Sequence, residues 1–260
     1  MAKDLKTIDI PNSNITSISF SSSEKPNIIF AVNFNKTAKI LQYSTISNNV
    51  TIEELPVQHK NEVNIVGYDS YFNFVGTSDD DETKLWDASN PSDRCKTTIR
   101  KQTFLAFYPN SEKTIMVTKS GTNVNFYEFQ GETSKPTVLK SIIHQNKVNC
   151  IAFYLFEDIS RFILAIGCQD NNIILWNIDS SNWQIKEIAT LSGHIGAVNS
   201  LAFYPNEPIL ASGSEDNTTK IWRQSPDSTW NCVATLSKTG NGKSLAFHPK
   251  KCFWQQVVII

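Results

Sequence analysis

The chain has 260 residues, of which 40% are hydrophobic and 19% are charged. This composition supplies enough apolar side chains for a packed core and too few charges for a disordered chain or a long coiled coil. The formal net charge of −1 gives no sequence-wide positive field that could hold a nucleic-acid backbone. We therefore expect a soluble globular protein of one large or two small domains, with nucleic acid disfavoured as its principal ligand.

The sequence shows no sign of export or membrane insertion. Its first residues, MAKDLKTIDIP, lack the apolar run of a secretory signal, and its apolar runs, such as 162–167, are far shorter than the roughly 18–20 residues that cross a bilayer. The five cysteines form no CxxC pair and are odd in number: Cys95, Cys150, Cys168, Cys232 and Cys252. We expect a cytoplasmic or nuclear protein without membrane contact, disulfide framework or zinc site.

The predicted elements are short strands along the whole chain. The N-terminal segment predicts an outer strand at 5–10 and an inner strand at 15–20. The following segments alternate apolar and polar residues, are rich in β-branched and aromatic residues, and are separated by Gly, Asn, Asp and Pro. The clearest stretch predicts strands at 184–191, 198–204, 209–214 and 218–222, with a tight turn at 215–217. The C-terminal segment predicts an inner strand at 245–249 and at most one more at 252–260.

Two short strings recur along the chain. The first is TFLAFYP at 103–109, which returns as IAFY at 151–154, LAFYP at 201–205 and LAFHP at 245–249, so that its Phe recurs after 46, 50 and 44 residues. The second appears as TKLWD at 83–87, IILWN at 173–177 and TKIWR at 219–223. Aligning the second string places five residues at one position of the repeat: Leu41, Trp86, Phe126, Trp176 and Trp222.

Four strands per ~45 residues is the size of one propeller blade, and the chain resembles the WD-repeat β-propellers. The resemblance is strongest at 184–222 and good at 55–87 and 140–177. It implies an all-β fold in which 1–260 form a single β-propeller domain of about six blades. The expected units are 11–54, 55–98, 99–140, 141–189, 190–236 and 237–260, together with the N-terminal strand 5–10.

The length fits no complete ring. Six blades of ~45 residues need roughly 270 residues and seven need roughly 315. The strand at 5–10 would complete the blade begun at the C-terminus, but the strand that would carry the final Trp is absent. Either the sixth blade is an incomplete three-stranded unit, or the sequence is a truncated form of a longer, seven-bladed protein.

The resemblance also implies a buried network that joins a His before the inner strand, a hydroxyl on the second strand, an Asp in the next turn and the Trp of the third strand. The complete set is His194, Ser212, Asp216 and Trp222. Two further sets are incomplete: His59, Asp80 and Trp86 with Gly76 at the hydroxyl position, and His144, Asp170 and Trp176 with Ile166 there. Because such groups satisfy one another's hydrogen bonds, we expect them to brace the sheets and not to catalyse a reaction.

Three other patterns imitate functional sites. His, Asp and Ser together suggest a hydrolase triad, but the same types recur at repeat positions that would be buried. The string SKTGNGKS at 237–244 imitates the end of a phosphate-binding loop, yet it lacks the first Gly and precedes a strand instead of a helix. The acidic cluster 79–82 falls on a turn between strands, where solvent or a partner protein would face it. We therefore expect no catalytic residue, no cofactor, no metal and no small-molecule substrate.

The family resemblance places partner-facing residues beside the inner strand and before the turn Asp, on the top face of the propeller. These positions hold Glu62, Asn64, Asp79, Lys147, Asn149, Gln169, Asn199 and Glu215. Their mixed polarity suits a peptide or loop of another protein, so the sequence predicts a non-catalytic protein-interaction scaffold or adaptor. Two alternatives remain: a nucleic-acid-linked adaptor, because KTIDIPNSNITSISFSSS is similar to the start of the mRNA-export and spindle-checkpoint propellers of the nuclear pore, and a propeller enzyme.

Overall fold

The computed structural model describes residues 17–20, 27–44, 46–47, 49–55, 59–69, 71–90, 95–108, 113–129, 135–156, 158, 160–237, 244–247 and 257–259. These residues form strands and no helix, which confirms the expected all-β class. The strands make five four-stranded sheets and one two-stranded sheet within the described ranges. This succession of four-stranded antiparallel sheets agrees with the predicted β-propeller of about six blades.

The chain divides into two compact units, one made of residues 1–118 and 127–137 and the other of residues 119–126 and 138–260. The first unit contains two whole sheets. One consists of β1 (Ile18–Phe20), β2 (Asn27–Phe34), β3 (Thr37–Ser44) and β4 (Val50–Glu54). The other consists of β5 (Ile65–Asp69), β6 (Phe74–Ser78), β7 (Glu82–Asp87) and β8 (Thr97–Arg100).

A third sheet is divided between the two units. Its strands are β9 (Phe104–Tyr108), β10 (Thr114–Ser120), β11 (Asn123–Phe129) and β12 (Thr137–Ile143). Within the first unit, β5 lies beside β1 and β2, and β9 lies beside β5 and β6. Each sheet of the unit therefore packs on the next through its first strands.

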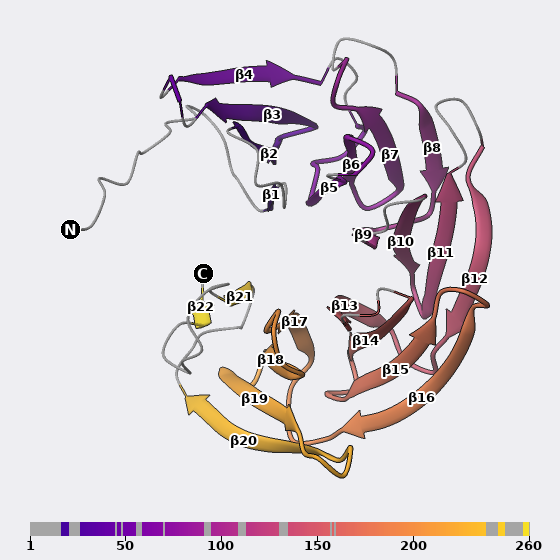
Figure 1. The fold of residues 1–260 in the computed structure, drawn as a ribbon, viewed down its shortest axis with the longest axis vertical. Coiled ribbons are helices and arrows are strands. Elements are labelled where there is room, and N and C mark those ends of the chain that lie inside the picture. The colour runs from indigo at the N-terminus through magenta and orange to yellow at the C-terminus, as the bar shows by residue number, and fades with distance from the viewer. Residues whose placement is uncertain are drawn as a thin grey trace. The chain divides into compact units, whose positions relative to one another are not determined.

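The second unit contains two whole four-stranded sheets and a short pair. The first sheet consists of β13 (Val148–Leu155), β14 (Arg161–Cys168), β15 (Ile173–Asp179) and β16 (Gln184–Leu191). The second consists of β17 (Val198–Phe203), β18 (Ile209–Ser214), β19 (Thr218–Gln224) and β20 (Trp230–Ser237). The pair is β21 (Leu245–Phe247) and β22 (Val257–Ile259). Figure 1 shows the strands of each four-stranded sheet side by side in chain order.

Apolar side chains of adjacent sheets meet between them. In the second unit, β17 packs against β13 and β14, and Trp222 joins a buried cluster with Cys150, Ile163 and Leu175. In the first unit, Trp86 lies in a cluster with Val66 and Val75. Burying large apolar side chains in this way contributes roughly 1.5–3 kcal/mol each. The segments in which apolar and polar residues alternate thus form strands, and the apolar side chains of the inner strands pack against the neighbouring sheet.

The turns between the second and third strands reverse the chain with residues in the left-handed region. Asn217 has a φ of 61°, Asn171 has 72° and Asn35 has 52°, and Gly121 occupies the corresponding turn of the third sheet with 60°. Asn and Gly tolerate this conformation better than other residues, as the sequence led us to expect for 215–217. These turns place the Asp216 and Asp170 segments at one end of their sheets.

Several predictions concern segments that the structure does not describe. The outer strand at 5–10, the phosphate-loop-like residues 238–243, Cys252 and most of the segment similar to the mRNA-export propellers lie outside the described residues. Within the described part of the chain, no helix has the length and apolar character needed to cross a bilayer.

Candidate functional site

The most complete polar network lies in the sheet β17–β20. Nδ1 of His194 is 2.8 Å from Oδ2 of Asp216, and Nε2 of His194 is 2.8 Å from Oγ of Ser212. The indole N–H of Trp222 donates to the same Ser212 oxygen at 2.8 Å. His194, Ser212 and Trp222 are each no more than 6% exposed. The four residues named from the sequence thus form one continuous chain of hydrogen bonds.

The protons of this network have one arrangement that uses every donor. Ser212 accepts the Trp222 N–H and donates its own proton to Nε2 of His194, so the imidazole proton lies on Nδ1 and is donated to Asp216. Burial lowers the pKa of His194, which keeps the ring neutral. Burial acts to raise the pKa of Asp216, but hydrogen bonds from Thr218, Ile195 N–H and His194 outweigh it and lower that pKa.

The stability of the chain should fall in mild acid. Burial holds the pKa values of His59, His144 and His194 below the ordinary 6.5. As the pH drops through 6.5, the unfolded chain therefore takes up protons that the folded chain excludes, and the free energy of unfolding decreases. A further decrease in the free energy of unfolding is expected below pH 3.8. There the aspartates of the unfolded chain take up protons, whereas the folded chain holds the pKa values of Asp79 and Asp216 lower. Urea unfolding at a series of pH values checks this, and a stability that rises as the pH falls from 7.5 to 5.5 contradicts it.

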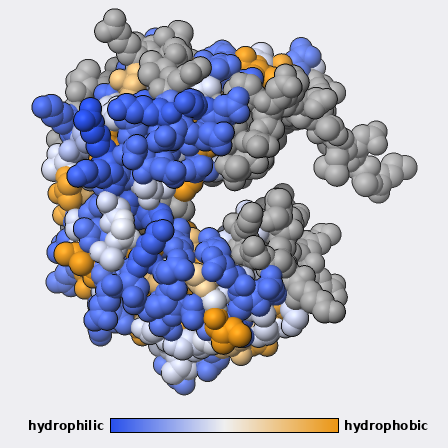
Figure 2. All heavy atoms as spheres, turned by 180° about the vertical axis from the view of Figure 1, so that it is seen from behind, coloured by the Kyte–Doolittle hydropathy of each residue, from blue (hydrophilic) through white to orange (hydrophobic). Residues whose placement is uncertain are grey.

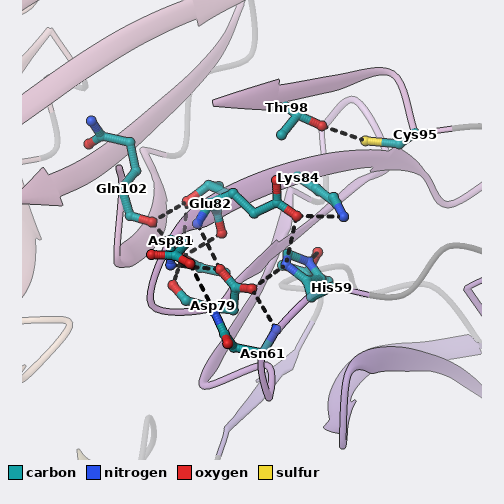
Figure 3. Close-up of polar contacts among 12 residues, drawn as sticks. His59, Asn61, Asp79, Asp81, Glu82, Lys84, Cys95, Thr98 and Gln102 are labelled. Atoms are coloured by element: carbon teal, nitrogen blue, oxygen red, sulfur yellow. Dashed lines mark hydrogen bonds and ion pairs between the residues drawn. The ribbon is translucent and has the colours of Figure 1, made fainter. Parts of the chain in front are cut away.

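The network of the sheet β5–β8 differs from the sequence prediction. Nε2 of His59 is 2.7 Å from Oγ1 of Thr77, and the indole N–H of Trp86 donates to the same oxygen at 2.9 Å. Nδ1 of His59 faces Oδ2 of Asp79 at 3.5 Å (Figure 3). The hydroxyl is therefore supplied by Thr77 and not missing at Gly76, and the carboxylate belongs to Asp79 and not to Asp80.

The cause of this error is a turn that is one residue shorter. Thr77 pairs with Lys84, two residues before Trp86, just as Ser212 pairs with Lys220, two residues before Trp222. Six residues separate the first pair and seven separate the second. Counting back from the Trp therefore places the hydroxyl at residue 76 instead of 77. The carboxylate is displaced the other way, from 80 to 79, because it lies two residues after Thr77 whereas Asp216 lies four residues after Ser212. A hydroxyl residue next to Gly76 was the only signal in the sequence that could have revealed it.

Asp79 organises this shorter turn. Its Oδ1 accepts the backbone N–H groups of Asp81 at 2.8 Å and Glu82 at 2.7 Å, and its Oδ2 accepts that of Asn61 at 3.2 Å. These hydrogen bonds lower its pKa against the opposing effect of burial. Asp79 is fully buried, which overturns its predicted partner-facing role. Asp80 is exposed instead and accepts the side-chain N–H of Asn64 at 2.8 Å.

His59, Asp79 and Glu82 are also the group of ligand-type residues that lie within reach of one ion in the described part of the chain. Nδ1 of His59 is 3.8 Å from Oε1 of Glu82, which in turn lies 2.7 Å from Nζ of Lys84 (Figure 3). The Lys84 ammonium already neutralises Glu82, and Asp79 is engaged with backbone N–H groups. We assign the group to hydrogen bonding within the sheet, so the lack of a metal site stays a prediction from the sequence.

The network of the sheet β13–β16 is open. Ile166 pairs with Ile174, two residues before Trp176, and so occupies the place of the hydroxyl, as predicted from the sequence. Nε2 of His144 and Nε1 of Trp176 are buried and have no hydrogen-bond partner among the described residues. Asp170 does not bond to His144 but accepts N–H groups from Asn146 at 2.7 Å and Asn172 at 3.2 Å. His144 and Trp176 keep only an edge-to-face ring contact, with centroids 5.7 Å apart.

The first and third sheets use apolar residues at the Trp position. Leu41 and Phe126 are both fully buried. In the third sheet, the hydroxyl of Thr118 donates to the side-chain oxygen of Gln102, and both residues are buried in the first unit. The repeat comparison missed this pair because Gln102 matches no His in the alignment. The hydrogen bond between Gln102 and Thr118 satisfies buried polar groups with a Gln in place of a His.

The predicted top-face residues of the second unit lie along the turn ends of two adjacent sheets. The backbone N–H of Gln169 donates to the carbonyl of Lys147, which brings these two exposed residues together. The side-chain amide of Asn149 donates to Oδ1 of Asn199 at 3.4 Å, and the amide of Asn199 donates to Glu215 at 3.3 Å. This amide surface, defined here as Lys147, Asn149, Gln169, Asn199 and Glu215, is exposed or half-buried.

The corresponding positions of the first unit form a smaller polar surface. Glu62, Asn64 and Asp80 are exposed at the turn end of the sheet β5–β8. On the face drawn in Figure 2, hydrophilic residues predominate and hydrophobic residues appear in separate groups. Two half-buried tryptophans of the second unit pack against other rings: Trp183 contacts Phe126 with centroids 5.3 Å apart, and Trp230 contacts Phe203 at 6.2 Å.

Comparison with known proteins identifies the repeats. The family model "WD domain, G-beta repeat" matches residues 137–177 and 185–223, which contain the two networks of the second unit. The chain therefore contains WD repeats, as the resemblance predicted. The matched ranges also cover most of the sheets β13–β16 and β17–β20, in each of which the Trp lies on the third strand.

Relatives of this WD-repeat chain have diverse names. It is 34% identical over 105 residues to Pre-mRNA-processing factor 19 of Oryza sativa subsp. japonica, covering 40% of this chain and 16% of the relative. It is 25% identical over 203 residues to the Transcriptional corepressor LEUNIG_HOMOLOG of Arabidopsis thaliana, covering 76% and 24%. It is 33% identical over 109 residues to the Polycomb protein EED of Chaetomium thermophilum, covering 40% and 19%. These matches span at most a quarter of the length of each relative.

Proposed function

We propose that this chain is a non-catalytic scaffold that assembles a multiprotein complex, and that its described sheets belong to one propeller domain with the units expected from the sequence. The observation that carries the proposal is the division of its polar residues. In the sheet β17–β20, the His, Asp and hydroxyl groups that could serve chemistry bond to one another, as in His194, Ser212 and Asp216. The residues of the amide surface, at the turns of the sheets, are exposed or half-buried and can contact other molecules.

The amide surface provides the chemistry for such contacts. Asn149 uses one side-chain N–H for its bond to Asn199, so its remaining donor and acceptor can pair with the backbone of a peptide. Lys147 and Glu215 add one charge of each sign within the same surface. A surface of this kind matches a polar loop or extended peptide better than an apolar helix.

The names of the relatives agree with a scaffold in the nucleus, the cytoplasm or both. A pre-mRNA-processing factor, a transcriptional corepressor and a Polycomb protein are the names that the matched proteins carry. We propose protein partners for this chain by analogy, without a nucleic acid as direct ligand, in keeping with the net charge of −1.

The proposal predicts that removing two amides of this surface releases partners. Tagged wild-type chain and an Asn149→Ala/Asn199→Ala variant should be purified from cells and compared by quantitative mass spectrometry. A matched Asn177→Ala/Asn231→Ala variant removes two exposed strand amides elsewhere in the second unit. We expect the first variant to lose a set of proteins by tenfold or more, on the order of 1.4 kcal/mol, and the second to keep them. An unchanged set in both variants, at equal thermal stability, argues against the amide surface.

A further inference from the structure

A cavity of about 320 Å³ lies in the second unit at the open network of the sheet β13–β16. Its walls come from the loop before β13, the turn between β14 and β15, and the outer strand β16. Its lining residues include His144, Asn146, Asp170, Trp176, Glu187 and Thr190. Ligand pockets in proteins span about 300–1,000 Å³, so this cavity has room for one long side chain and not for a large cofactor.

His144 gives this cavity an unused polar group. The residue is 7% exposed, and Nε2 is buried without a partner. No described residue forms a hydrogen bond with its Nδ1 either, whereas both ring nitrogens of His194 are bonded in the neighbouring sheet. The difference arises because Asp170 turns to Asn146 and Asn172 and leaves the space beside the imidazole unfilled. Buried polar groups normally have partners, so an unpartnered imidazole on a cavity wall indicates a place for a ligand.

The charge of the cavity indicates which ligand fits. Asp170 and Glu187 line it, and the lining contains no Lys or Arg. Glu187 accepts one hydrogen bond, from the hydroxyl of Thr190 at 3.0 Å, so its carboxylate has acceptor capacity to spare. Burial lowers the pKa of His144 although both carboxylates act to raise it, so the ring stays neutral and its unprotonated nitrogen can accept a hydrogen bond. The indole of Trp176 adds an aromatic ring to the same wall.

A single metal ion does not fit this arrangement. The group of described His, Cys, Asp and Glu residues whose ligand atoms lie close enough for one ion is His59, Asp79 and Glu82, in the other unit. His144, Asp170 and Glu187 are spread more widely around the cavity. A cationic side chain with an apolar stem needs to hydrogen-bond only some of these groups, and its stem can lie along the cavity wall.

We propose that this cavity binds the side chain of a lysine from a partner peptide. The ammonium donates to the Glu187 carboxylate and to an imidazole nitrogen of His144, the Asp170 carboxylate adds negative charge nearby, and the methylene stem lies against Trp176 and Ile143. An ammonium has three donors, which suffice for these two acceptors, and hydrogen bonds between charged groups are stronger than neutral ones. Contact with the indole face adds cation–π attraction. The site goes beyond the amide surface and does not depend on it, since it can be occupied in the isolated chain.

The test uses the purified full chain with ¹⁵N-labelled indoles and an acetylated, amidated pentapeptide of four glycines around one lysine. We expect a saturable shift of the Trp176 indole N–H signal, assigned with a Trp176→Phe variant. A matched peptide with norleucine keeps the stem and removes the charge, and it should give no such shift. An equal shift with the norleucine peptide, or no shift with the lysine peptide at millimolar concentration, overturns the proposal.

Two substitutions locate the binding. Glu187 is exposed on the outer strand β16, so Glu187→Gln removes a charge without disturbing the core. We expect it to weaken the affinity for the lysine peptide about tenfold. Glu207→Gln removes a partly exposed charge away from the cavity and should leave the affinity unchanged. An affinity that is the same in both variants contradicts the assignment of the ammonium to this cavity, whatever the outcome of the partner purification.

Discussion

Replacing Trp222 by alanine should lower the free energy of unfolding by about 3–5 kcal/mol, the range for large aromatic truncations in cores. The indole is 3% exposed and packs in the apolar cluster of the second unit. It also donates to Ser212, which links it to His194 and Asp216. The substitution therefore opens a cavity and removes one end of a buried hydrogen-bond chain. Urea or thermal unfolding of the purified variant measures the loss.

Trp183→Ala is the matched control for this prediction. Trp183 is half-buried and contacts Phe126 with centroids 5.3 Å apart, and its φ of 54° places it in a turn. Losing this contact should cost about 1–2 kcal/mol, within the usual range for single substitutions. A loss at Trp183 equal to or greater than the loss at Trp222 contradicts the assignment of Trp222 to the bracing network.

Asp79→Ala should destabilise the chain far more than Asp80→Ala. Asp79 is fully buried and accepts three backbone N–H groups and faces His59. Its removal leaves these part-buried backbone N–H groups without their partner, at a cost of about 1–3 kcal/mol for each group that solvent cannot reach. Asp80 is exposed and bonds only to the exposed amide of Asn64, so its removal should change the stability by about 0.5 kcal/mol or less.

Unfolding of both variants, measured in the same buffer, decides between the two carboxylates. The comparison is sharp because the residues are neighbours with identical side chains and differ only in burial and bonding. Equal losses of stability, or a larger loss for Asp80→Ala, would contradict the assignment of Asp79 to the network and favour Asp80. The Thr77→Val variant provides a second measurement, because it removes the hydroxyl that joins His59 to Trp86 while keeping a β-branched side chain.

Most of the structural features predicted from this sequence follow from its internal repeats. The recurring Phe and Trp strings place four strands in each unit, because alternation of apolar and polar residues builds a half-buried strand wherever it occurs. The network of His194, Ser212, Asp216 and Trp222 follows from the same alignment, since its members stand at fixed positions in a complete repeat. The substitution of Ile166 for the hydroxyl is readable for the same reason.

Counting along the sequence does not determine spatial register. The turn after Thr77 is one residue shorter than the turn after Ser212, and only the pairing of β6 with β7 reveals it. The buried carboxylate is that of Asp79 and the exposed one is that of Asp80, although their side chains are the same. Gln102 and Thr118 were not found because their pairing joins residues 16 positions apart that belong to no repeat motif.

The amino-acid sequence alone determined the all-β class, the repeating sheets and the residue types that brace them, since strand periodicity and repeat spacing are local properties of the chain. Tertiary structure alone decided which carboxylate is buried, which imidazole lacks a partner and where a cavity opens beside it. Burial and hydrogen-bond partnership depend on side chains that approach from other strands, and a change of one residue in a turn redirects them without altering the strand pattern.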